Sequence, residues 1–97
     1  MLIHIVVWKY RQDVPEETRA EHVLMLKRLP DLVPGIVSFH VGRDILHLDR
    51  SYDTGLTSVF ADREALDTYT DHEEHQKVDS MGKQIAEKVA SVDFFAE

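Results

Sequence analysis

The sequence predicts a single α+β domain in which four strands form an antiparallel sheet and helices cover one face. The chain has 97 residues, enough for one domain and not two. Four short runs are rich in β-branched and aromatic residues, as strands are. Stretches with helical periodicity separate the first run from the second and the third from the fourth. The four expected strands are Leu2–Tyr10, Ile36–Asp44, Tyr52–Ala61 and Lys88–Phe95.

The first strand and the first helix are the clearest elements. In the strand, Leu2, His4, Val6, Trp8 and Tyr10 fall on one face. The helix is expected to begin at Pro15, which suits a first helical position, and to end near Leu29, because a residue before proline is pushed out of the helical region. Its apolar stripe consists of Ala20, Val23, Leu24, Leu26 and Leu29. We expect His22 to be exposed.

The middle of the chain predicts two strands joined by a loop. Pro34 and Gly35 form a turn signal before the second strand. Residues 45–51 show no regular pattern and are expected to form a loop. In the third strand, Leu56, Ser58 and Phe60 should share one face.

Two cap signals follow the third strand. Asp62 is a good N-cap for the stretch that contains Tyr69. Asp71, with Glu74 three residues later, is typical of a capping box for a further helix from His72 to about Gln84.

This order of elements is that of a ferredoxin-like βαββαβ subunit, with its helices on one face of the sheet. Both strand faces are too apolar for one of them to lie in water. Val37 and Phe39, or the residues that alternate with them, are expected on the uncovered face. The simplest way to bury the uncovered face is for a second copy of the chain to pack sheet to sheet, giving a homodimeric α+β barrel.

Charge and composition exclude several classes of function. Eighteen acidic and 11 basic residues give a net charge of -7, which disfavours binding to nucleic acid or to an anionic membrane. The absence of cysteine excludes disulfides and thiol nucleophiles. No basic residue precedes the apolar start, and no cleavage site follows it, so we expect a cytoplasmic protein.

Four stretches together resemble a known family. They are IHIVVWKY, LPDLVPGIVSFHVGRD, FADREALDTYTDHEEH and VASVDF, and they cover nearly the whole chain in order. The Phe-x-x-Gly motif after the Pro-Gly turn, and a tyrosine six residues before a histidine, are fairly specific in combination. On these residues the chain resembles the stress-responsive A/B barrel domain (Dabb) family of the dimeric α+β barrel superfamily, over residues 1–97.

The resemblance implies a ferredoxin-like subunit, a two-fold dimer and a cavity between sheet and helices. A few members are enzymes, among them a plant polyketide cyclase that uses a tyrosine and a histidine for acid/base work beside a first-strand histidine. Tyr69, His75 and His4 match these positions. The chain departs from the cyclase at Thr54, where the cyclase has a further histidine, and from the usual family pattern at Glu73, where proline is common.

The residues themselves also indicate a proton-transfer site. A neutral His75 near a helix start could accept a proton, and Tyr69 could donate a hydrogen bond to a carbonyl. His4 lies among aliphatic residues and needs a hydrogen-bond partner. Trp8, Phe39 and His72 are expected to contact a ligand. The alternative is that these side chains are core residues with no chemical role.

A metal site is the weaker interpretation. His72 and His75, with Asp71, Glu74 or Asp79, could in principle hold a divalent ion. These carboxylates fit a helix cap and a solvated face equally well, and no metal-binding signature such as HExxH is present. We therefore expect no metal, and no glycine-rich loop predicts a nucleotide cofactor.

Three functions remain open at this point. The first is an enzyme acting on a small apolar or aromatic carbonyl compound, with His75 as base, Tyr69 as hydrogen-bond donor and His4 as orienting residue. The second is a dimeric module, linked to stress, that binds a small apolar ligand without chemistry. The third is a cofactor-free monooxygenase, which relatives in the wider superfamily resemble.

Overall fold

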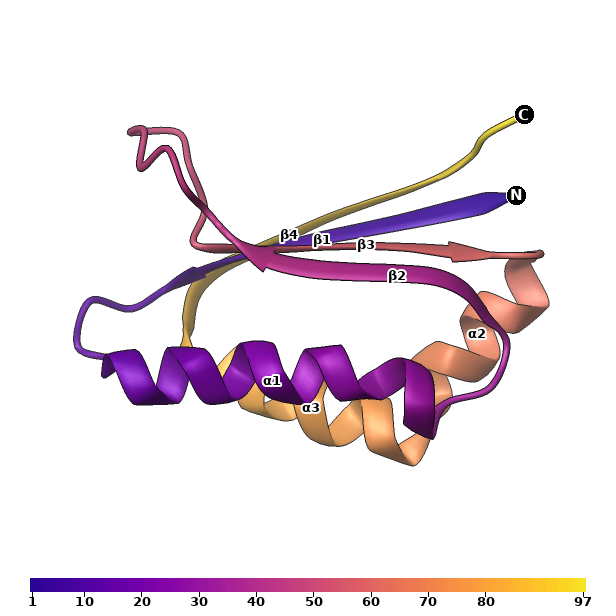
Figure 1. Cartoon of the computed structure of the whole chain (residues 1–97), viewed down its shortest axis with the longest axis horizontal. Helices are drawn as coiled ribbons and strands as arrows, with labels where there is room; N and C mark the ends of the chain where they lie inside the picture. The colour runs from indigo at the N-terminus through magenta and orange to yellow at the C-terminus, as the bar shows by residue number, and fades with distance from the viewer.

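The structure is a computed structural model that describes residues 1–97, and it has the predicted ferredoxin-like order of elements. The elements are β1 (Leu2–Tyr10), α1 (Glu16–Leu32), β2 (Ile36–Arg43), β3 (Thr54–Phe60), α2 (Arg63–Asp71), α3 (Glu73–Ile85) and β4 (Ala86–Phe95). The sheet has the strand order β2-β3-β1-β4, and every neighbouring pair is antiparallel. The three helices lie on one side of the sheet, and α1 and α3 run side by side beneath it (Figure 1). The prediction of fold class is therefore confirmed.

The strand faces follow the expected alternation. Leu2, Trp8 and Tyr10 of β1 are buried on the helix side, as are Leu56 and Phe60 of β3. The core thus lies between this face and the helices. Strand boundaries differ from prediction by up to two residues, because β3 begins at Thr54 and β4 begins at Ala86.

The opposite face of the sheet has no helix over it. Ile5 of β1 pairs with Val92 of β4, and Ile3 pairs with Phe94. Val92 is 53% exposed and Phe94 is 42% exposed. Phe39, for which the sequence left the face open, packs against the core on the helix side. An apolar face of this kind on a single chain is typical of a surface that another protein covers.

Helix α1 corrects the prediction at both ends. Pro15 is the N-cap residue and not the first helical residue. Pro30 lies inside the last turn, so the expectation that it ends the helix near Leu29 was wrong. The helix continues because Val33 donates its backbone N–H to the Leu29 carbonyl at 2.8 Å. Proline therefore removes one hydrogen bond of the last turn without ending it.

His22 was expected to be exposed, and this was wrong. It is fully buried, because it lies four residues before Leu26 and seven before Leu29, on the stripe that faces the sheet. Leu24, which we placed on that stripe, is instead 50% exposed.

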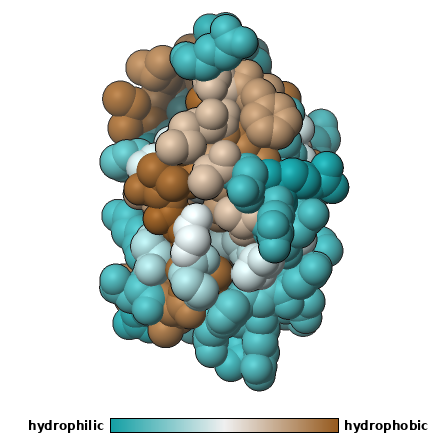
Figure 2. Space-filling view, turned by 90° about the vertical axis from the view of Figure 1, so that its right-hand side faces the viewer, coloured by the Kyte–Doolittle hydropathy of each residue, from teal (hydrophilic) through white to brown (hydrophobic).

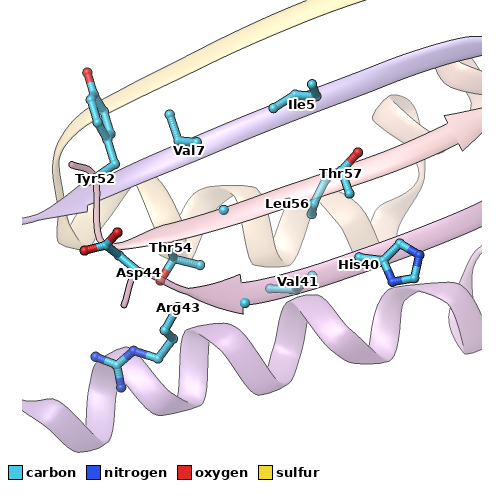
Figure 3. A pocket seen from close by; sticks show the side chains of 12 residues that line it. Ile5, Val7, His40, Val41, Arg43, Asp44, Tyr52, Thr54, Leu56 and Thr57 are labelled. Carbon is cyan, nitrogen blue, oxygen red and sulfur yellow. The ribbon is translucent and has the colours of Figure 1, made fainter. Parts of the chain in front are cut away.

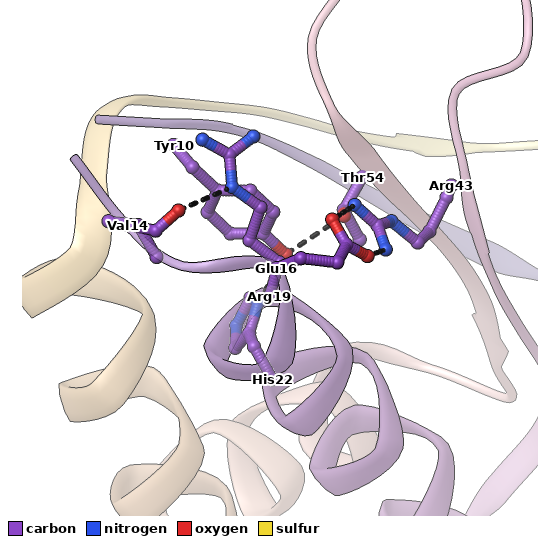
Figure 4. Close-up of polar contacts among 7 residues, drawn as sticks. All are labelled: Tyr10, Val14, Glu16, Arg19, His22, Arg43 and Thr54. Atoms are coloured by element: carbon purple, nitrogen blue, oxygen red, sulfur yellow. Dashed lines mark hydrogen bonds and ion pairs between the residues drawn. The ribbon is translucent and has the colours of Figure 1, made fainter. Parts of the chain in front are cut away.

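A chain of hydrogen bonds accommodates His22 in the core (Figure 4). The Tyr10 hydroxyl lies 2.7 Å from His22 Nδ1 and 2.8 Å from Thr54 Oγ1. Outside this chain, Arg43 pairs with Glu16, and Arg19 donates to the Val14 carbonyl at 3.0 Å. No partner reaches His22 Nε2, the one enclosed side-chain polar atom without a hydrogen bond.

The helix junction after the third strand also differs from prediction. Asp62 caps α2 as expected, accepting the Ala65 N–H at 2.9 Å. The capping box at Asp71 was wrong, because Asp71 is the last residue of α2. His72 takes the cap position of α3, and its Nδ1 accepts the Glu74 N–H at 3.1 Å. None of the helices has the length and apolar character needed to cross a membrane.

Burial of His22 predicts a loss of stability in acid. Desolvation lowers the pKa of His22 from 6.5 to about 4. As the pH falls through that window, the unfolded chain binds a proton that the folded chain does not. Above pH 6.5 the contribution of neutral His22 to the free energy of unfolding is fully present. By pH 4 the free energy of unfolding is therefore lower by on the order of 3 kcal/mol.

The His22→Phe variant should lose most of this acid dependence. Urea unfolding at pH 7 and pH 4.5 measures it, with the exposed His47→Gln variant as control. Equal pH dependence in His22→Phe and in the unaltered protein would contradict this explanation.

Candidate functional site

Tyr69 is the centre of an aromatic cluster between the sheet and the helices. It lies near the end of α2, is 1% exposed, and packs against Phe60 of β3 at 5.1 Å between ring centroids. The rings of Phe39 and His4 are each 6.2 Å away. The ring of His75, on the first turn of α3, is closest at 4.4 Å.

His75 is held in one orientation by the backbone. Its Nδ1 lies 3.0 Å from the carbonyl oxygen of Thr70, which can only accept a hydrogen bond. Nδ1 therefore carries the proton, and in the neutral ring Nε2 keeps a free lone pair. Burial lowers the pKa of His75; the Thr70 carbonyl and the charge of Asp79 oppose this shift, and His4 adds to it. The neutral form is accordingly favoured near pH 7.

The Tyr69 hydroxyl is neutral and makes no hydrogen bond within the protein. Burial, helped by the charge of Asp79, raises the pKa of Tyr69 well above its usual value of 10. The hydroxyl has no hydrogen-bond partner in the chain, yet it is not among the enclosed unpartnered atoms, of which His22 Nε2 is the only one. A small part of it therefore reaches solvent, where it can donate a hydrogen bond to a bound molecule.

His4 has a partner that the sequence analysis missed. It faces Asp93 across the β1–β4 pair, and its Nδ1 hydrogen-bonds to Asp93 Oδ1. The side chain of His4 is 15% exposed. A carboxylate at one ring nitrogen fixes the orientation of the ring, the arrangement that hydrolases use to orient a histidine. Pairing the last strand with β1 in antiparallel register would have placed Asp93 opposite His4, and this was the signal that could have identified Asp93.

The structure brings together four of the six predicted site residues. His4, Phe39, Tyr69 and His75 share the aromatic cluster. Trp8 lies elsewhere on β1, where its ring packs edge-on against His22 at 5.1 Å. His72 caps α3 and is only partly buried. Their expected roles in ligand binding have no support from this placement.

The three main surface hollows lie outside the aromatic cluster. The largest, about 600 Å³, is on the uncovered sheet face, where Ile5, Val7 and His40 surround the cross-strand pair Gly42–Gly55 (Figure 3). A second hollow of about 370 Å³ lies between α2 and the end of β4. Its lining includes Asp93, which holds His4, and Thr70, which holds His75. A third, of about 140 Å³, is again on the uncovered face.

No group of three or more histidine, aspartate and glutamate side chains lies close enough together to hold a metal ion. The ring of His75 is bonded to the Thr70 carbonyl, and the Nδ1 of His72 is bonded to the Glu74 N–H. In each of the two rings, one nitrogen is therefore already hydrogen-bonded to the backbone nearby.

Comparison with known proteins identifies similar sequences and structures. A sequence profile described as the stress responsive A/B barrel domain matches residues 2–96. No curated protein matches the chain.

Among solved structures, a dimeric ferredoxin-like protein of unknown function from Thermobifida fusca has a TM-score of 0.89 at 18% identity, covering 98% of this chain and 90% of that one. A dimeric protein of unknown function with a ferredoxin-like fold from Bacteroides fragilis has a TM-score of 0.82 at 26% identity, covering 96% and 93%. A hydroxynitrile lyase from Passiflora edulis has a TM-score of 0.88 at 14% identity, covering 99% and 93%.

The two internal tyrosines should respond differently to loss of their hydroxyl. Tyr69→Phe removes a group with no partner in the chain, so the free energy of unfolding should change by less than about 0.5 kcal/mol. Tyr10→Phe removes the shared partner of His22 and Thr54, so it should cost about 1–3 kcal/mol. Urea denaturation of both variants at pH 7 makes the comparison, and a larger loss for Tyr69→Phe would contradict the assigned hydrogen bonding.

Proposed function

The chain belongs to the stress responsive A/B barrel domain family, and from that premise we propose a homodimer that catalyses proton transfer on a small carbonyl compound. The observation that carries the proposal is the contact between Tyr69 and His75, with the His75 ring tied to the Thr70 carbonyl. This contact puts a neutral base beside a neutral hydrogen-bond donor.

His75 is the proposed base. Its Nε2 lone pair takes a proton from the carbon next to the carbonyl, or from a hydroxyl group on the substrate. The electron pair of the broken C–H bond moves toward the carbonyl oxygen and forms an enolate. The lowered pKa of His75 keeps the ring unprotonated and ready at neutral pH.

Tyr69 and His4 complete the proposed chemistry. The Tyr69 hydroxyl donates a hydrogen bond to the carbonyl oxygen, where negative charge develops. Its raised pKa keeps the proton in place at neutral pH. His4, held by Asp93, orients the substrate and stabilises charge on the side of the sheet. Return of the proton from His75 to a different carbon gives isomerisation. Attack of the enolate carbon on a second carbonyl group of the substrate, whose oxygen then takes the proton from His75, gives cyclisation. When the base instead removes a hydroxyl proton, the adjacent C–C bond breaks, and the carbon released takes that proton back from His75.

The solved relatives support the proposal at the level of fold. A hydroxynitrile lyase has this architecture, so the scaffold can carry a lyase, but 14% identity is too low to transfer its reaction. Relatives from Thermobifida fusca and Bacteroides fragilis are dimeric. The uncovered apolar sheet face of this chain suits the same arrangement.

A ligand-binding module without chemistry is the second candidate. Tyr69 is 1% exposed, and neither it nor His75 lines any of the three main hollows. If this closed state persists with ligand, the hollow beside Asp93 could bind a molecule that never meets the base. The two candidates differ in one measurable property, the exchange of a carbon-bound proton.

Hydrogen–deuterium exchange on acetophenone tests the catalytic proposal. In D2O at pD near 7.5, the protein should speed replacement of the methyl protons by deuterium, which proton NMR follows directly. His75→Ala should reduce the rate by about 10²–10⁴-fold, because the base is lost. Tyr69→Phe should also reduce it, because the developing oxyanion loses its donor.

The variant Arg28→Met, at an exposed residue of α1, serves as control and should exchange protons as the unaltered protein does. If the protein and its His75→Ala variant both match buffer, for acetophenone and for cyclohexanone and phenylacetaldehyde as well, the second candidate replaces the first.

A further inference from the structure

We propose that the hollow between α2 and the end of β4 is the binding site of a small, uncharged aromatic carbonyl compound, recognised by Arg63 and Phe95. This inference rests on the proposed function, because it names the class of substrate for that chemistry and assigns its binding place next to the residues that hold His4 and His75. It adds two residues that have no part in the proton transfer itself.

The hollow is built from one side of α2 and one end of the sheet. Arg63, Leu66, Asp67 and Thr70 recur at intervals of three and four along α2, so they present one side of the helix to it. Across from them lie Leu2 and Phe95, which are paired in register at the open end of the sheet. A volume of about 370 Å³ is within the range of small-molecule sites and suits a compound with a single ring.

The hollow adjoins the residues that hold both catalytic rings. Asp93 lines it and binds His4 Nδ1. Thr70 also lines it, and its carbonyl oxygen accepts the hydrogen bond from His75 Nδ1. A ligand bound here would therefore contact a residue that is itself hydrogen-bonded to His4, and another that is hydrogen-bonded to His75. Neither of the other two main hollows reaches a residue that holds His4 or His75.

The charges around the hollow favour a ligand that is polar but not anionic. Arg63 Nε donates to Asp67 Oδ1 at 2.9 Å, which balances one positive charge with one negative charge. The side chain of Arg63 is 75% exposed, and its terminal N–H groups make no bond within the chain, so they can donate to a ligand oxygen. A carboxylate in the same place would face both Asp67 and Asp93, so a neutral carbonyl oxygen is the better acceptor.

Phe95 supplies the aromatic surface. Its register with Leu2 puts it on the helix side of the sheet, and it is 70% exposed at the last position of β4. Figure 2 shows this end of the molecule, with apolar side chains gathered over the upper part that carries the sheet and hydrophilic ones over the lower, helical part. An exposed ring beside a hollow offers a face on which a flat ligand ring can stack.

Binding of acetophenone, compared with benzoate, tests the inference. Titration of the ¹⁵N-labelled protein at pH 7, followed by amide NMR, gives both the location and the dissociation constant. Acetophenone should shift the amides of Arg63, Leu66 and Phe95, and benzoate should bind more weakly. Arg63→Met and Phe95→Ala should each weaken acetophenone binding by about three- to tenfold, the effect of one hydrogen bond or one ring contact.

Two exposed residues away from the hollow provide matched controls. Arg28→Met on α1 and Val37→Ala on β2 make the same kinds of change and should leave the dissociation constant unaltered. The inference is overturned if acetophenone shifts no amide around the hollow, if benzoate binds as tightly, or if the Arg63 and Phe95 variants bind like the controls.

Failure of the inference and failure of the proposed function give different results. Binding of acetophenone at the hollow without any proton exchange would support the site and contradict the catalysis. Proton exchange whose KM is the same in Arg63→Met and Phe95→Ala as in the controls would support the catalysis and contradict this site.

Discussion

The structure depends on a four-stranded sheet that is apolar on both faces, of which the helices of one chain cover only one. The covered face buries Leu2, Trp8, Leu56 and Phe60 against α1, α2 and α3 and forms the core. The other face leaves Val92 and Phe94 about half exposed. Burial of apolar area stabilises a protein by roughly 25 cal/mol per Å², so a sheet that keeps one apolar face in water forgoes a large share of that energy. We propose that a second copy of the chain covers this face, and the dimeric relatives support this proposal.

The covered face also explains where the candidate chemistry lies. The pairing of β1 with β4 places Asp93 beside His4, and the short junction between α2 and α3 turns His75 back against Tyr69. Each histidine has its Nδ1 bonded, one to a carboxylate and one to a backbone carbonyl. The two rings therefore differ in setting: Asp93 holds His4 from the neighbouring strand, and burial favours a neutral His75. One fold thus supplies a candidate base and a candidate orienting group near the same phenol.

Much of this arrangement follows from sequence, and the parts that do not have identifiable causes. Strand periodicity and the order of elements predict the sheet, and the resemblance to the family points to Tyr69 and His75 as a pair of site residues. His22 was misplaced because a histidine is usually exposed, whereas here a buried tyrosine and threonine offer it hydrogen bonds. Asp93 was missed because its partner is 89 residues away, and only strand register reveals it. The cap at His72 was missed because Asp71, a better cap former in isolation, is still helical.

Light scattering coupled to size-exclusion chromatography tests the central claim most directly. At micromolar concentration the 11.2 kDa chain should elute with about twice that mass. A double variant, Ile5→Glu with Val92→Glu, places two charges at a paired position of the uncovered face and should shift the mass to that of one chain. The exposed control Leu24→Glu, on the outer side of α1, should stay dimeric. A folded, unaltered protein that runs as a single 11.2 kDa chain would contradict the account.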